Sequence, residues 1–220
     1  MKRFLSLLAA LLMLCGVAAA EGMVAPTELT QAEMDMLDLM GMQWGVHIYD
    51  FTAPEDAKTV VLTLWELEDG QWASRTTATI SLEDYGMAGR IALQSTDCLG
   101  FDLYMCLWTP DGYTSIGSDD EMPEELWVMN MAVEDLWEQA NVALEDVQPL
   151  LMEFLCDEVE MPETGLHLWA QPEALGVFDG VYAVTVQFIA VTESEYYEMD
   201  EDYDWIEWED MGEGSDGSSW

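Results

Sequence analysis

The stretch that decides the fold is 181-VYAVTVQFIAV-191, which follows the turn signal Asp179-Gly180. One set of its side chains (Val181, Ala183, Thr185, Gln187) alternates with another (Tyr182, Val184, Val186, Phe188). Because successive side chains of a strand point to opposite faces, this alternation predicts a strand with one core face and one wetter face.

Shorter segments of the same kind recur along the chain, separated by turn signals such as Glu68-Asp69-Gly70 and Pro110-Asp111-Gly112. The strands that we expect cover residues 44–49, 60–67, 72–82, 90–94, 101–108, 113–116, 126–131, 150–155 and 166–170. Residues 132–147 are ambiguous, with apolar spacing that also fits a short helix. Many short strands and few helices predict an all-β protein, with a single β-sandwich or jelly-roll-like domain over residues 43–192.

The N-terminus has the three parts of an export signal. Lys2-Arg3 is followed by an apolar run and then by Ala18-Ala19-Ala20, a pattern typical of a cleaved signal peptide. We therefore expect residues 1–20 to be a signal, with an uncleaved membrane anchor as the alternative. Residues 21–42 are expected to form a leader and a short helix, which begins at the capping-box pattern of Thr30 and Glu33.

The chain that follows the signal is strongly acidic. It has 45 acidic residues and three basic ones (Lys58, Arg75, Arg90), which gives a formal net charge of −42. Residues 91–220 contain 32 acidic residues and no lysine or arginine. This charge argues against nucleic acid and anionic membrane surfaces as partners, because both are bound through lysine and arginine. It favours a cationic protein or peptide, or cations, as the partner of a secreted, extracellular or cell-surface protein.

Residues 193–220 differ from the rest of the chain. They hold 12 acidic residues with tyrosines and tryptophans set between them, and they end in a Gly/Ser-rich run. Such a composition predicts a disordered tail. Aromatic side chains between carboxylates suit docking onto a basic, partly apolar surface.

Three cysteines remain after the signal, namely Cys98, Cys106 and Cys156. Outside the cell an odd count predicts one disulfide and one thiol. Three pairings are open, and we favour Cys106–Cys156 because both residues lie in or next to expected strands.

Two acidic clusters are candidates for a calcium site. Asp200, Asp202 and Asp204 have the spacing of the first three ligands of an EF-hand loop, although later positions do not match that motif. A looser candidate comprises Asp119, Asp120 and Glu121. The alternative for both is a solvated acidic segment, and no other cofactor is expected.

Two pairs of aromatic residues flank the predicted turns. Trp108 and Tyr113 lie on either side of Pro110-Asp111-Gly112, and Trp65 and Trp72 flank Glu68-Asp69-Gly70 in the same way. Exposed pairs of this kind suit stacking on the rings of a glycan. The ordinary alternative is a cross-strand pair that stabilises its hairpin.

Catalysis has little support in the sequence, and we expect no catalytic residues. Only His47 and His167 could serve as a base beside a serine or cysteine, and both are expected to face solvent at alternating strand positions. The sequence therefore predicts a secreted, acidic, non-enzymatic binding or adaptor protein. A carbohydrate- or calcium-binding module is the alternative, and a small hydrolase is less favoured.

Overall fold

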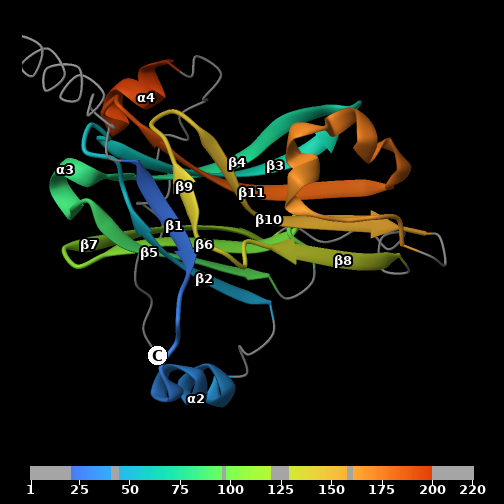
Figure 1. Ribbon diagram of the computed structural model, residues 1–220, viewed down its shortest axis with the longest axis horizontal. Coiled ribbons are helices and arrows are strands. Elements are labelled where there is room, and N and C mark those ends of the chain that lie inside the picture. Colours follow the sequence, from blue (N-terminus) through green and yellow to red (C-terminus); the bar gives the residue numbers. More distant parts are fainter. Residues whose placement is uncertain (1–20, 41–44, 96–97, 120–128, 158–160, 200–220) are drawn as a thin grey trace, which may run out of the picture.

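The computed structural model describes residues 21–40, 45–95, 98–119, 129–157 and 161–199. In these ranges the chain forms two antiparallel sheets and few helices (Figure 1), which confirms the all-β class. The predicted signal and the acidic residues Asp120, Glu121, Asp200, Asp202 and Asp204 lie outside the described residues.

The first sheet, sheet A, has six strands. Their order is β7 (Gly112–Asp119), β6 (Asp102–Thr109), β5 (Ala88–Ser95), β2 (Val46–Thr52), β1 (Gly22–Pro26) and β9 (Ala140–Val142). Sheet B has the order β4 (Gln71–Ser81), β3 (Thr59–Glu68), β11 (Gly180–Ile189), β10 (Val147–Cys156) and β8 (Asn130–Asp135). The alternating segment that begins at Val181 therefore forms β11 and lies at the centre of sheet B.

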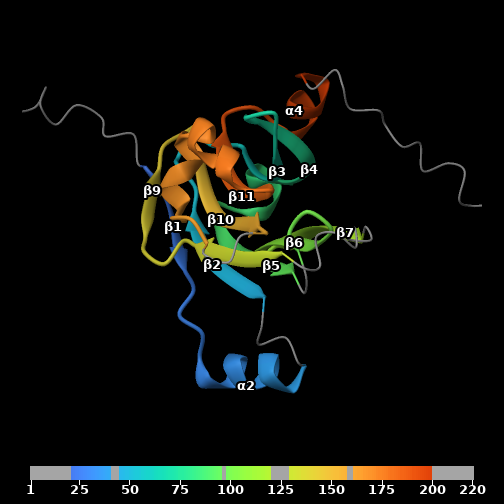
Figure 2. The same cartoon turned by 90° about the vertical axis from the view of Figure 1, so that its right-hand side faces the viewer.

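The two sheets lie as two layers with a shared core between them (Figure 2). Phe51 of β2 packs against Phe188 of β11, with ring centroids 6.0 Å apart. The buried Tyr49 hydroxyl donates a hydrogen bond of 3.0 Å to the carbonyl of Leu150 in the other sheet. Burial of the alternating apolar side chains drives this association of the sheets.

The outer face of sheet B is covered by two short 3-10 helices, η2 (Leu166–Ala170) and η3 (Pro172–Val177), drawn in orange in Figures 1 and 2. Leu175 is fully buried there, against outward-facing residues of β10 and β11 such as Phe154 and Ala183. Residues 166–170 were predicted as a strand, and that prediction is wrong. An alternation of five residues is too short to distinguish a strand from a 3-10 turn that packs one side on a sheet.

Two other segments also differ from the expectation. Residues 21–29 are not only a leader, because β1 pairs with β2 and β9 and buries Val24. The ambiguous residues 132–147 form the end of β8, then β9 and the start of β10. Pairing with strands that are distant in sequence determines both outcomes.

The hairpin between β3 and β4 forms at the predicted turn. Both residues of its two-residue loop have positive φ, 49° at Asp69 and 77° at Gly70, as the loop twist of such hairpins requires. Helix α3 (Leu82–Tyr85) follows β4 directly.

Two further helices flank the sheets. Helix α2 (Gln31–Leu39) begins with a complete capping box between Thr30 and Glu33 and buries none of its residues. Helix α4 (Glu193–Met199) lies within the stretch predicted as a tail, and Thr79 of β4 donates a hydrogen bond to the Glu193 carboxylate. The predicted disorder therefore does not apply to residues 193–199. No helix in the described ranges is both long and apolar enough to span a bilayer.

Candidate binding site

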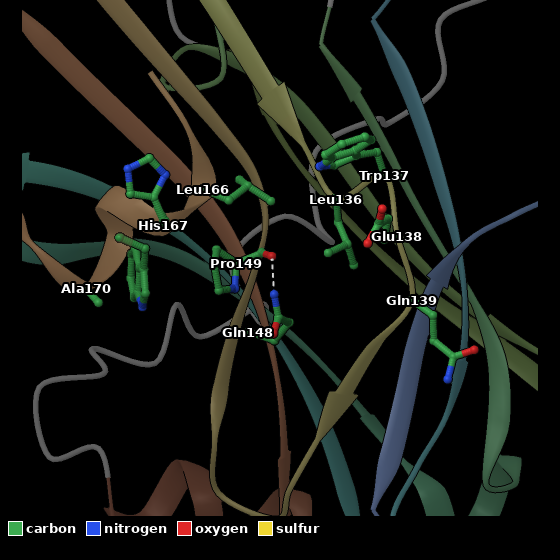
Figure 3. Close-up of a pocket in the computed structure, with 10 residues that line it drawn as sticks. Leu136, Trp137, Glu138, Gln139, Gln148, Pro149, Leu166, His167 and Ala170 are labelled. Atoms are coloured by element: carbon green, nitrogen blue, oxygen red, sulfur yellow. Dashed lines mark hydrogen bonds between the residues drawn. The ribbon is translucent and has the colours of Figure 1, made fainter. Parts of the chain in front are cut away.

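A groove of about 410 Å³ lies where the β8–β9 connection meets η2. We call it the Trp137 groove; its lining residues are Leu136 to Gln139, Gln148, Pro149, Leu166, His167, Trp169 and Ala170. Figure 3 shows Trp137 and Glu138 on one side, His167 and Ala170 on the other, and Leu136, Pro149 and Leu166 between them. The middle of the groove is therefore apolar and its sides carry polar and aromatic groups.

The backbone fixes the Trp137 side of this groove. The Leu136 N–H donates a hydrogen bond of 2.8 Å to the Leu150 carbonyl, and the Leu136 side chain is buried in the core. The next side chain, Trp137, points outward and is 81% exposed. An indole with so little cover is a common feature of binding surfaces.

The opposite side is held by a cluster of three tryptophans. Trp169 stacks on Trp72 with ring centroids 4.5 Å apart and meets Trp65 edge-on at 5.8 Å. The Trp72 indole N–H donates to the Trp169 carbonyl at 3.1 Å, and the Trp65 indole N–H donates to Thr185 Oγ1 at 2.9 Å. Trp65 and Trp72 are thus half-buried, and Trp169 of η2 lies against both of them.

The polar lining residues of the groove include one carboxylate, Glu138, and no lysine or arginine. Glu138 is exposed, and one N–H of the Gln148 amide donates to the Pro149 carbonyl at 2.8 Å. Every lining residue lies in the part of the sequence that contains no lysine or arginine. A cation is therefore the charged ligand that this groove would accept.

The second aromatic pair lies on the outer face of sheet A. Trp108 of β6 is directly opposite Tyr113 of β7, and their exposed fractions are 48% and 71%. Tyr104 lies on the same face of β6 and is also exposed. The structure therefore brings together the pair that the sequence singled out.

The predicted cation and disulfide sites gain no support. Asp119 is the last residue of β7, and its predicted partners lie outside the described ranges. Cys106 forms no disulfide, so the Cys106–Cys156 bridge is absent; the two residues belong to different sheets.

Cys156, Asp157 and Asp179 form a group that the sequence analysis did not identify. Their ligand atoms lie within 4.8 Å of one another. One Asp179 oxygen already accepts the Asp157 backbone N–H at 2.9 Å. Calcium prefers six to eight oxygen ligands, and two carboxylates beside a thiol do not match that preference.

The two histidines lie in different environments. His47 does not face solvent as expected: it lies on the same side of β2 as Tyr49, and its Nδ1–H donates to Asp135 Oδ2 at 3.1 Å. His167 is exposed on η2. The observed partner of His47 is thus the carboxylate of Asp135.

A buried carboxyl group on the inner face of sheet B was also missed. Glu153 of β10 is only 1% exposed; its Oε2 accepts the Leu99 N–H at 3.3 Å, and its Oε1 has no hydrogen-bond partner. Burial raises the pKa of Glu153, with hydrogen bonds from Cys98 and Leu99 opposing that shift. Burial also raises the pKa of the Cys98 thiol, and the Glu153 charge adds to this effect. The pair is enclosed in the core, so it bears on stability rather than on binding.

No protein-family model matches the chain, and comparisons with curated proteins and with solved structures found no similar protein.

Proposed function

We propose that this chain is a secreted, non-enzymatic binding protein that engages a cationic protein or peptide. The observation that carries the proposal is that both arginines are already paired with carboxylates of the same chain, while many other carboxylates stay exposed. Arg75 pairs with Glu66, and Arg90 pairs with Glu33 and Asp50 at 3.0 Å each. Exposed carboxylates meanwhile remain at several places on loops and short helices, including Glu28, Glu55, Asp56, Glu83, Asp84, Asp111, Asp146 and Glu173.

These carboxylates repel one another and attract positive charge. A cationic partner would relieve that repulsion where the two surfaces meet, and the complementary charge would also speed association. In this proposal the domain is a single β-sandwich, which the shared core of the two sheets supports. The jelly-roll form, the export signal and the extracellular location remain predictions from the sequence.

The experiment is a binding titration of residues 21–220 with a fluorescent arginine- and lysine-rich peptide. A neutral peptide of matched length serves as the control. We expect saturable binding to the cationic peptide that weakens as salt is added, because screening reduces the attraction between opposite charges. Equal binding of the two peptides, or no binding of either, would contradict the proposal.

The tail is tested separately by removing residues 200–220, which keeps α4 and its contact with Thr79 intact. We expect weaker capture of the cationic peptide by the shortened chain, since the deletion removes carboxylates and aromatic side chains together. Unchanged capture would restrict the binding surface to residues 21–199.

Carbohydrate binding is a second candidate function, favoured by the exposed Trp108–Tyr113 pair. Flat aromatic rings on an open sheet face suit stacking on a sugar ring. A glycan array compared between the wild-type chain and the double variant Trp108→Ala/Tyr113→Ala tests it. Retention of the same glycan signals by the double variant would exclude this pair.

Calcium binding stays a prediction, because most of its candidate ligands lie outside the described residues.

A further inference from the structure

We propose that the Trp137 groove binds an arginine side chain from an extended basic segment of the partner. This inference rests on the proposed function and assigns a position and a residue type to it. Three features of the groove carry it, namely its apolar middle, its aromatic side and its charge.

The apolar middle suits the stem of a long side chain. Leu136, Pro149 and Leu166 lie between the two sides (Figure 3). The three methylene groups of arginine can be buried against such a surface while the charged end stays at the rim. A short acidic or polar side chain would leave this part of the groove unfilled.

The aromatic groups suit a planar cation. Trp137 is 81% exposed, and Trp169 on the other side is held by its stacking on Trp72. A guanidinium group lies flat on an indole ring and is less strongly hydrated than an ammonium group. Arginine is therefore favoured over lysine at this position.

The charge of the groove is the third feature that suits an arginine side chain. Glu138, an exposed carboxylate, lies on the same side as Trp137 (Figure 3). Gln148 uses one amide N–H for the Pro149 carbonyl and keeps a second N–H and its Oε1. A carboxylate such as that of Glu138 is an acceptor that a guanidinium fork can bind through two parallel hydrogen bonds.

The test compares three peptides of the same length, rich in arginine, lysine or citrulline, in fluorescence anisotropy with residues 21–220. Citrulline keeps the shape of arginine and lacks its charge. We expect the arginine peptide to bind most tightly and the citrulline peptide least. Trp137→Ala should weaken arginine-peptide binding on the order of 10-fold, the size of a partly desolvated cation–aromatic contact.

Matched variants separate the groove from the general acidity of the chain. Glu138→Gln should weaken binding more than Glu83→Gln, which removes an equal charge from an exposed position on α3. Leu39→Ala, another exposed apolar side chain, should leave binding unchanged. Because Trp137 is exposed, its variant should unfold at the same denaturant concentration as the wild-type chain.

The outcomes distinguish the two proposals. Tight arginine-peptide binding that Trp137→Ala and Glu138→Gln leave unchanged would overturn the groove and leave the cationic partner in place. Failure of the wild-type chain to bind any cationic peptide would overturn the proposed function itself. Equal binding of the citrulline peptide, or capture of a neutral oligosaccharide that Trp137→Ala abolishes, would overturn the arginine assignment.

Discussion

The two sheets differ most in what covers their outer faces. Sheet B carries η2 and η3, which bury Leu175 and bring Phe178 to 4.9 Å from Phe154, between ring centroids. Sheet A instead exposes Trp108 and Tyr113 on its outer face. Its link to α2 runs through Arg90 and Glu33, without a buried apolar contact from the helix.

This difference shows why a local pattern cannot decide whether a tryptophan is buried. The hairpins β3–β4 and β6–β7 both carry aromatic residues beside a tight turn. Trp72 is covered by Trp169, which is 97 positions away in the sequence, whereas Trp108 remains 48% exposed beside the described residues. The covering segment, and not the hairpin, determines which pair is available to a ligand.

The largest effect is expected from removing that cover with Trp169→Ala. The change deletes a ring that stacks on Trp72 and packs against Trp65, and it leaves a cavity over sheet B. We expect the free energy of unfolding to fall by about 3 kcal/mol, at the low end for tryptophan because the side chain is only half-buried. Urea denaturation measures the loss.

Trp108→Ala on sheet A is the matched control for that experiment, with an expected change below about 1 kcal/mol. Iodide quenching of tryptophan fluorescence should also rise in Trp169→Ala, as Trp65 and Trp72 become exposed. Similar losses of stability in the two variants would mean that η2 does not distinguish the two faces.

Much of the fold was predictable from residues 181–191 and from the turn signals. The alternating pattern of residues 181–191 placed β11, and the Asp69-Gly70 turn placed the β3–β4 hairpin. The wetter face expected for β11 is wrong, because η2 and η3 cover that side and Val181, Ala183 and Thr185 are buried. The errors fell on short segments such as residues 22–26 and 166–170, whose structure depends on distant partners. A five-residue pattern carries too little information to determine whether it pairs in a sheet or packs on one.

The candidate site was harder to predict for the same reason. Val133, Leu136, Trp137 and Ala140 have helical spacing, which hid the fact that Leu136 enters the core while Trp137 turns outward. The groove forms only where this connection meets η2, and nothing local indicates that meeting. Glu153, in contrast, left a signal, because it is a single carboxylate inside the apolar run 150–155.

Sheet B also differs from sheet A in carrying the buried carboxyl group of Glu153 on its inner face. The variant Glu153→Gln tests how this group affects stability. Burial raises the pKa of Glu153 in the folded state above that in the unfolded chain. The stability that comes from protonated Glu153 is therefore fully present below the pKa of about 4.3 in the unfolded chain. It is lost as pH rises from there through the higher pKa of the folded state. Glutamine does not titrate, so the free energy of unfolding of the variant should rise relative to that of the wild type as pH increases. The expected difference is about 1–3 kcal/mol at pH 8.

Denaturant unfolding of both chains from pH 4 to pH 8 measures this difference. Glu173→Gln on η3 makes the same change in charge at an exposed position and should follow the wild-type curve. Parallel curves for Glu153→Gln and the wild type would show that Glu153 is ionised at no cost in the core.

A smaller effect is expected where sheet A meets α2. Hydrogen bonds from the Thr30 side chain and backbone, and then from Arg90, lower the pKa of Glu33 from 4.5 to about 2. A lowered pKa contributes stability above the unfolded value, and this contribution is lost as pH falls through about 2. Glu33→Gln should therefore be less stable than the wild type at pH 6, and the difference should shrink as pH approaches 2.

Circular dichroism during denaturation across that pH range provides the measurement. The exposed side chain of Glu33 keeps the effect small, because solvent and salt screen such pairs. Asp38→Asn, at the other end of the same helix, should show no comparable convergence at low pH. A difference from the wild type that stays constant down to pH 2 would mean that the capping box and Arg90 do not hold this carboxylate.

The smallest effect concerns the exposed aromatic pair itself. A double-mutant cycle of Trp108→Ala and Tyr113→Ala isolates the energy of their mutual contact from that of each side chain alone. Directly opposed aromatic residues on an open face should couple by less than about 1 kcal/mol, since solvent already reaches both rings. A coupling as large as the whole Trp169→Ala effect would mean that the pair is covered in solution, and the contrast between the two outer faces would disappear. A weak coupling would leave the two rings available as a surface for a ligand.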